Sequence, residues 1–220
     1  MSIKARAISA LRHFDTGDKF AHLPLPKASV LIPLCVRGEE LHALMTLRSM
    51  ELRTNAGEVC FPGGKRDPGD RDDVETALRE AQEEIGLQPD QVQVLCTLTP
   101  VVNKSGLLVT PVVGFIDEDF RPSPNPAEVS AVFTVPLELF TQEENHALVP
   151  VNGLEGPLHC FHYQDVVSNS HYHIWGLTAV LAVLVAVCVL QKKTEFEVGF
   201  EFENPLHFFE QNLLKRISKL

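Results

Sequence analysis

Residues 61–87 of this chain read FPGGKRDPGDRDDVETALREAQEEIGL, and this stretch decides the fold and the site that we expect. Its second half repeats apolar residues at the spacing of an α-helix, from about Asp72 to Ile85. Gly86 follows where a helix commonly ends, because glycine readily adopts the left-handed conformation of a C-terminal cap. The first half is rich in Gly, Pro, Arg and Asp and has no periodicity. We therefore expect a long loop that leads into an amphipathic helix.

The expected helix separates its apolar and its acidic side chains. At about 100° per residue, Glu80, Glu83 and Glu84 fall on one side of the helix. The opposite side carries an apolar stripe that consists of Val74, Ala77, Leu78, Ala81 and Ile85. Three convergent carboxylates suit a hard divalent cation such as Mg²⁺ or Mn²⁺, which would cancel their repulsion. The alternative is a solvated acidic face, which is the usual role of a run of charges.

Composition limits the class of protein. The chain has 220 residues, of which 45% are hydrophobic and 22% are charged, and these fractions are typical of a soluble globular domain. We expect one domain over residues 1–220. Asp and Glu total 29 and Lys and Arg total 19, so the net charge of −10 makes a nucleic-acid partner unlikely. An acidic chain can still bind a phosphate ligand through a divalent cation.

The cysteines point to a reducing compartment. They are odd in number, widely spaced and without a C-x-x-C pair, which argues against a disulfide framework and against a structural zinc site. They are Cys35, Cys60, Cys96, Cys160 and Cys188. The N-terminal residues contain no apolar core long enough for a secretory signal.

Two segments near the C-terminus bear on localisation. Residues 174–190, IWGLTAVLAVLVAVCVL, carry no charge but are at the short limit of a membrane span, which needs about 17–25 residues. We expect a helix buried in the core and no membrane span; a membrane-anchored binding protein is the alternative. Ser218, Lys219 and Leu220 form a C-terminal peroxisomal address, which implies an import receptor as partner and the peroxisomal matrix as location.

Apolar runs rich in β-branched residues predict several strands. A turn at residues 37–40 joins the first two strands as a hairpin. The expected strands cover residues 28–36, 41–47, 92–98, 107–116 and 129–135, with a weaker candidate at 159–163. Their irregular alternation with helices favours an α/β fold with a mixed sheet flanked by helices.

The acidic helix and its loop resemble the Nudix box, G-x5-E-x7-R-E-U-x-E-E-x-G-U. The matching residues are Gly64, Asp70, Arg79, Glu80, Glu83, Glu84, Gly86 and Leu87. Two departures stand out. Asp70 replaces the glutamate of the pattern, and eight residues instead of seven separate it from Arg79. Arg79 can tether this loop carboxylate to the helix.

The preceding residues resemble the signature of the coenzyme A-specific Nudix enzymes, L-L-T-x-R-[SA]-x3-R-x3-G-x3-F-P-G-G. Residues 44–49 read LMTLRS and are followed at the required spacing by Arg53, by Gly57 and by residues 61–64. The single departure is Met45 in place of leucine. The two motifs adjoin each other, which makes the combined resemblance highly specific.

The resemblance implies a Nudix-type α/β/α sandwich with a mixed sheet. It also implies metal-dependent hydrolysis of the diphosphate of coenzyme A, and of acyl-CoA esters, to 3′,5′-ADP and 4′-phosphopantetheine or its acyl ester. Glu80 and Glu84 would be ligands of Mg²⁺ or Mn²⁺, Glu83 a third ligand or the general base, and the Gly64 carbonyl a further ligand. Gly63, beside Gly64, would lie against the substrate. A Nudix hydrolase of another nucleoside diphosphate, such as NADH, ADP-ribose or capped RNA, is the alternative.

Other residues have two interpretations each. Arg48 and Arg53 can bind substrate phosphates, because a guanidinium matches a phosphate bidentately, or can pair with Glu51 or Glu58. Glu128 either reaches the site or forms a salt bridge at a strand edge. Four histidines gather further along the chain: His159, His162, His171 and His173. Since oxygen ligands suit a hard cation better, we interpret these four as ordinary surface or core histidines.

Overall fold

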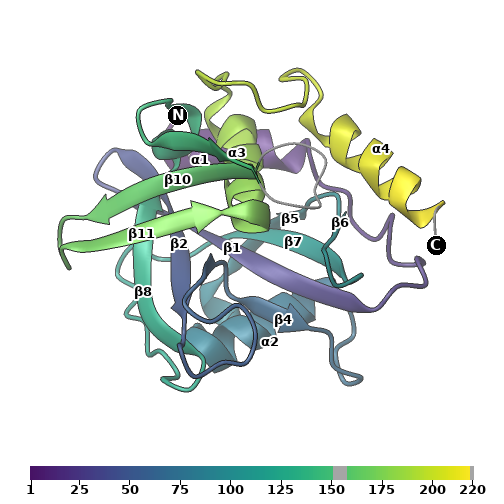
Figure 1. The fold of residues 1–220 in the computed structure, drawn as a ribbon, viewed down its shortest axis with the longest axis horizontal. Coiled ribbons are helices and arrows are strands. Elements are labelled where there is room, and N and C mark those ends of the chain that lie inside the picture. Colours follow the sequence, from purple (N-terminus) through teal and green to yellow (C-terminus); the bar gives the residue numbers. More distant parts are fainter. Residues whose placement is uncertain (151–157, 219–220) are drawn as a thin grey trace.

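The computed structural model describes residues 1–150 and 158–218 (Figure 1). Short 3₁₀ turns at Pro89–Gln91 and Leu137–Thr141 complete the elements. In chain order, the helices and strands are α1 (Ile3–Arg12), β1 (Lys27–Arg37), β2 (Glu40–Arg48), β3 (Val59–Cys60), β4 (Gly63–Lys65), α2 (Asp73–Ile85), β5 (Gln93–Thr97), β6 (Val101–Val102), β7 (Leu108–Phe115), β8 (Val129–Pro136), β9 (His146–Val149), β10 (Leu158–Asp165), β11 (Ser170–Trp175), α3 (Gly176–Leu190) and α4 (Pro205–Ile217).

The main sheet is mixed, as the sequence predicts. Its strands run in the order β3-β2-β1-β7-β5, with β4 on β1, β6 on β7 and β8 on β2. Strands β1 and β7 pair in parallel, whereas the other pairs are antiparallel. The expected hairpin between β1 and β2 is present, with Arg37 opposite Glu40.

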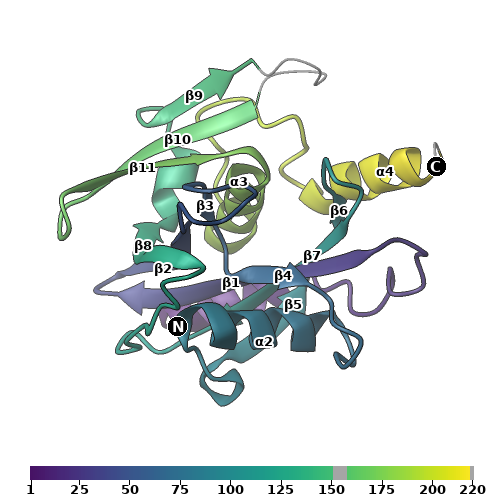
Figure 2. The ribbon, with the colours of Figure 1, turned by 60° about the horizontal axis from the view of Figure 1, so that its bottom comes forward.

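The two faces of the sheet are covered by different helices. Along β1, the side chains of Leu31 and Cys35 pack in one core cluster with Ala77 and Ala81 of α2. The alternate residues, such as Ile32 and Leu34, pack with α1 and α3 on the other face. Figure 2 shows α2 on one side of the sheet and α3 on the other. This arrangement is the expected α/β/α sandwich.

A second sheet of three antiparallel strands, in the order β11-β10-β9, lies on the α3 side (Figure 2). Strand β10 extends the weak candidate at 159–163, whereas β9 and β11 were not expected. Tyr172 of β11 stacks on Phe133 of β8, with ring centroids 3.6 Å apart. This contact packs the second sheet against the main one.

The apolar run at 174–190 forms a buried helix, but its start was misplaced. Ile174 and Trp175 end strand β11, and the helix α3 begins at Gly176. The pairing of Ile174 with Phe161 holds these residues in the strand despite their apolar continuation. Within the described residues, no helix combines the length and the apolarity that crossing a membrane requires.

Helix α2 has the ends that its sequence predicts. Asp72 is the N-cap, and its side chain accepts a hydrogen bond from the Glu75 N–H at 2.8 Å. Gly86 ends the helix in the left-handed conformation, with φ of 73°. The capping therefore orients both α2 and the loop that precedes it.

The chain after α3 returns across the molecule to α4, which Figure 1 shows in yellow near the C-terminus. Ser218 is the C-cap of α4 and donates a hydrogen bond from its hydroxyl to the Lys215 carbonyl. Lys219 and Leu220, the rest of the expected peroxisomal address, lie outside the described residues.

Candidate active site

Strand β4 places two glycines against the acidic side of α2. The Gly63 N–H donates a hydrogen bond to Oε2 of Glu84, at 3.1 Å. A Cβ atom on Gly64 would lie only 2.5 Å from the carboxyl carbon of Glu80. Any side chain at Gly64 would push this carboxylate away, so the glycine pair lets the backbone approach both glutamates closely.

The carboxylates of Glu80, Glu84 and Glu128 form one electrostatic cluster. Glu84 is only 5% exposed, and burial raises its pKa to about 7, with Glu80 and Glu128 adding to the shift. Burial also raises the pKa of Glu80, and the charges of Glu83 and Glu128 act in the same direction. Glu128, left open by the sequence, thus lies near enough to repel the helix glutamates.

Glu83 has a different environment from the other two helix glutamates. Its side chain is 54% exposed, and Oε2 pairs with Nη1 of Arg79 at 3.0 Å. The structure therefore places Glu83 at the rim of the cluster and Glu80 and Glu84 inside it. The arrangement does not assign the third ligand or the base.

Arg79 ties the loop to the helix through Asp70. Its Nε and Nη2 donate to the two carboxylate oxygens of Asp70 at 3.0 and 3.1 Å, and Nη2 also donates to the Lys65 carbonyl. These hydrogen bonds from Arg79 hold the pKa of Asp70 at about 2. Asp70 therefore makes the contact between the loop and Arg79, although it replaces the glutamate of the pattern and is separated from Arg79 by one more residue. Arg79 also pairs with Glu80 at 3.0 Å, which orients that carboxylate.

The two arginines of the upstream motif differ in burial. Arg48 ends β2 and is half-buried, and its Nε is buried without a hydrogen-bond partner among the described residues. Its positive charge acts on the pKa values of Glu84 and Cys60, so the guanidinium lies beside the acidic cluster. Arg53 is exposed in the following loop. Neither arginine forms an ion pair with Glu51 or Glu58 in the described part of the chain.

Backbone hydrogen bonds connect the segment that carries Glu128 to Ser49 and to Glu84. The Ser49 N–H donates to the Glu128 carbonyl at 2.8 Å, and the Asn125 N–H donates to the Glu84 carbonyl at 2.9 Å. Cys60 is also adjacent, because Glu84 and Arg48 both influence its pKa. Its place directly before residues 61–64 was the signal that could have identified it.

A divalent cation fits the chemistry of these donors. Their oxygens are hard ligands, and their mutual repulsion would be relieved by a positive charge. No three His, Cys, Asp or Glu side chains in the described residues already surround a common point. The fit consequently rests on donor chemistry and electrostatics.

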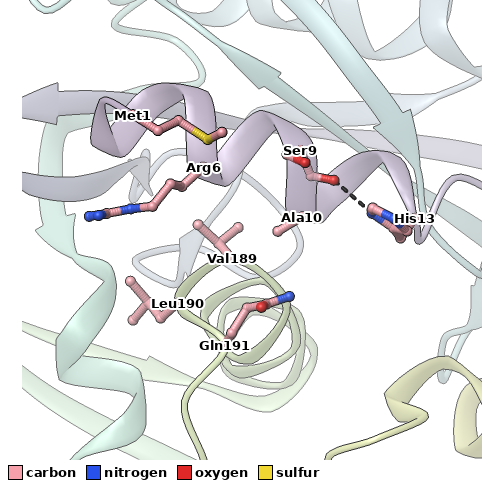
Figure 3. Close-up of a pocket in the computed structure, with 8 residues that line it drawn as sticks. All are labelled: Met1, Arg6, Ser9, Ala10, His13, Val189, Leu190 and Gln191. Carbon is pink, nitrogen blue, oxygen red and sulfur yellow. Dashed lines mark hydrogen bonds between the residues drawn. The ribbon is translucent and has the colours of Figure 1, made fainter.

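A separate hollow lies between α1 and the C-terminal end of α3, across the sheet from α2 (Figure 3). The side chains that line it include Arg6 and His13 but no carboxylate. His13 Nδ1 lies 2.7 Å from the Ser9 carbonyl. This hollow therefore shares neither the position nor the chemistry of the acidic cluster.

The class of protein is defined by a mixed sheet between helices that carries a glycine loop and a glutamate-bearing helix at one face. Residues 25–152 match the NUDIX domain model. The chain belongs to the Nudix family and is a Nudix hydrolase. Members of this family generally use divalent metal ions. Both the fold class and the enzyme class expected from the sequence are thus confirmed.

Individual relatives add detail to this assignment. The chain is 45% identical over 214 residues to the mouse peroxisomal coenzyme A diphosphatase NUDT7, covering 96% of this chain and 91% of the mouse protein. It is 42% identical to the chloroplastic Nudix hydrolase 22 of Arabidopsis thaliana over 77% of this chain, but this match spans only 57% of the plant protein. The crystal structure of RenU, a Nudix hydrolase from M. smegmatis, is 24% identical over 51% of this chain and 71% of RenU, with a TM-score of 0.45.

Proposed function

We propose that this enzyme hydrolyses the diphosphate of coenzyme A and of acyl-CoA esters. The products would be 3′,5′-ADP and 4′-phosphopantetheine or its acyl ester. The observation that carries the proposal is the position of Arg48, a residue of the upstream motif. Its Nε is buried without a partner among the described residues, and its positive charge lowers the pKa of the buried Glu84. The mouse relative, named as a coenzyme A diphosphatase, supports the same substrate.

Glu80 and Glu84 are the proposed ligands of Mg²⁺ or Mn²⁺, with Glu83 as a third ligand or the general base and the Gly64 carbonyl as a further ligand. When bound, the cation would neutralise the charge of the diphosphate and orient the attacking water. Arg79 positions the Glu80 carboxylate, and the Gly63 N–H holds one oxygen of Glu84. Water adds to a phosphorus atom, its proton passes to a carboxylate, and the P–O bond of the bridging oxygen breaks.

Arg48 and Arg53 are the proposed contacts to the substrate phosphates, together with the backbone of Gly63 and Gly64. A guanidinium offers two parallel donors to a phosphate, and Nε of Arg48 has no partner in the described protein. Arg48→Ala should therefore raise KM for coenzyme A by about tenfold or more. Arg37→Ala is the matched control and should leave KM unchanged, because Arg37 ends β1 opposite Glu40, at the other end of β2 from Arg48.

Product analysis on a substrate panel tests the function. Purified protein with Mg²⁺ would be given coenzyme A, an acyl-CoA, NADH, ADP-ribose and capped RNA in parallel. We expect 3′,5′-ADP and a phosphopantetheine product from the first two, and loss of this reaction in Glu84→Gln. Intact coenzyme A beside rapid hydrolysis of another member of the panel would overturn the substrate and favour the alternative.

We also propose the peroxisomal matrix as the location, through recognition of Ser218, Lys219 and Leu220 by the import receptor. The mouse relative is named as peroxisomal, which supports this location. An N-terminal fluorescent fusion should colocalise with a peroxisomal marker, and deletion of Leu220 should disperse it. A fusion that stays peroxisomal without Leu220 would contradict the proposed address.

A further inference from the structure

Three histidines lie on one face of the hairpin formed by β10 and β11. His162 pairs directly with His173 across the two antiparallel strands, and Gln164 pairs with His171. Directly opposite residues share a face, and so do residues two apart on one strand. His162, His171 and His173 are therefore neighbours on the same side of the hairpin.

The burial of the neighbouring residues shows that the three histidines lie on the solvent-exposed face of the hairpin. The intervening residues Phe161, Tyr172 and Ile174 are buried and belong to the core cluster shared with α3. His162, His171 and His173 are exposed. The histidine face is consequently open to solvent and to small solutes, while the opposite face fixes the backbone of both strands.

The central pair is already close together. The rings of His162 and His173 have centroids 4.3 Å apart and meet edge to face at 88°. Among the described residues, no hydrogen bond or ion pair occupies a ring nitrogen of these two side chains or of His171. Their donor atoms are therefore available to a ligand, and the strand register holds the pair together without one.

His159 has a different role from the three exposed histidines. Its Nδ1 lies 2.8 Å from Nε2 of His146, and Phe196 covers this pair. The pKa values of both His146 and His159 are lowered by burial. The structure thus divides the four histidines singled out in the sequence into one half-buried residue and three exposed ones.

We propose that His162, His173 and His171 form a site for a borderline divalent cation, with Zn²⁺ or Cu²⁺ as the expected metal. Neutral imidazole is a preferred ligand of these metals, whereas Mg²⁺ and Mn²⁺ prefer the oxygens of the acidic cluster. Three nitrogens and one water complete the four-coordinate geometry that zinc favours.

Metal binding requires movement of exposed side chains only. The described residues contain no three ligands that already converge, so His171 must rotate towards the central pair. Exposed side chains change rotamer within nanoseconds, and the diagonal neighbours of a strand pair are about 7–8 Å apart. Since β11 continues directly into α3, a metal bridging the two strands would also stabilise the entry to that helix.

Isothermal titration of the full, untagged chain with ZnCl₂ tests the site. Excess Mg²⁺ is present throughout, so that the carboxylate cluster is occupied by its own class of cation. We expect one zinc per chain at micromolar affinity, together with a rise in melting temperature. The variants His162→Gln and His173→Gln should each weaken binding by about tenfold or more. His171→Gln should weaken it by a smaller factor.

His207→Gln is the matched control, because this histidine is exposed on α4 and should leave zinc affinity unchanged. Coenzyme A hydrolysis in Mg²⁺ should be unaffected by all of these variants, so a failure of the zinc site does not affect the proposed function. Absence of zinc binding, or equal affinity in the wild type and in the His162→Gln and His173→Gln variants, would overturn the proposal.

Discussion

Helices α2 and α3 lie on opposite faces of the same sheet but expose very different surfaces. Helix α2 buries one stripe, which includes Ala77 and Ala81, and directs carboxylates away from it. Helix α3 is buried almost all round, with Leu184 among its fully covered residues. An amphipathic helix must lie at a boundary, where a site can form, whereas an apolar one must lie in a core.

The two helices also differ at their N-terminal ends. Asp72 caps α2 with its side chain and Gly86 ends it in a left-handed conformation. Trp175, the N-cap of α3, makes no side-chain capping hydrogen bond, although α3 also ends in a left-handed residue, Gln191. Local signals thus define α2, whereas packing defines α3, and four substitutions test this contrast.

The largest expected effect is the loss of activity in Glu84→Gln. The amide keeps the shape of the side chain but not its charge, so kcat for coenzyme A should fall by about 10²- to 10⁴-fold. Burial raises the pKa of Glu84, so its charged form is costly in the folded state. A neutral amide avoids this cost, and the melting temperature should stay the same or rise. Steady-state kinetics and thermal melting measure the two effects. Glu75→Gln, on the same helix, is the control, and equal kcat in both variants would contradict the site.

Leu184→Ala should have the largest effect on stability. Deleting a buried leucine from α3 leaves a cavity and lowers the free energy of unfolding by about 2–5 kcal/mol. Urea unfolding would measure this loss. The half-buried Leu78 of α2 supplies the comparison, and Leu78→Ala should cost about 1–2 kcal/mol. An equal loss in both variants would mean that the two helices are stabilised alike.

Asp70→Asn should weaken the anchor of the α2 loop by about 2 kcal/mol. The pKa of Asp70 is lowered from 3.8 to about 2, so its contribution is complete above pH 4 and is lost as the pH falls towards 2. The stability difference between the variant and the wild type should shrink over this pH range. Denaturant unfolding across the range measures it, and a constant difference would contradict the ionic contribution.

The smallest expected effect belongs to the N-cap of α2. Asp72→Ala removes the acceptor of the Glu75 N–H and should cost about 1 kcal/mol of unfolding free energy. The neighbouring Arg71→Ala removes an exposed side chain that pairs with Glu75, and it should cost less than Asp72→Ala. Chemical denaturation would compare them, and a larger loss for Arg71→Ala would reverse the importance of the two contacts.

Expectations from the sequence were accurate where the cause was local. The strands β1 and β2, their hairpin and the ends of α2 follow from periodicity, turn residues and capping residues. The expectations were less accurate for residues whose contact partners lie far away in the sequence. The sequence predicts that Asp67, Asp72 and Asp73 cap α2 and stabilise its N-terminal dipole. Asp72 is the N-cap, whereas Asp73 accepts a hydrogen bond from Thr110 of β7 at 3.0 Å.

The sequence by itself determined the family resemblance, the acidic helix and the glycine pair, because each of these is a short-range pattern. Only the tertiary structure decided that Glu128 joins Glu80 and Glu84, and that the charge of Arg48 acts on Glu84 while its Nε lacks a partner among the described residues. It also decided that three histidines share a face while the half-buried His159 contacts His146. Strand register and chain crossovers bring these residues together, and neither is encoded by the spacing of neighbours along the chain.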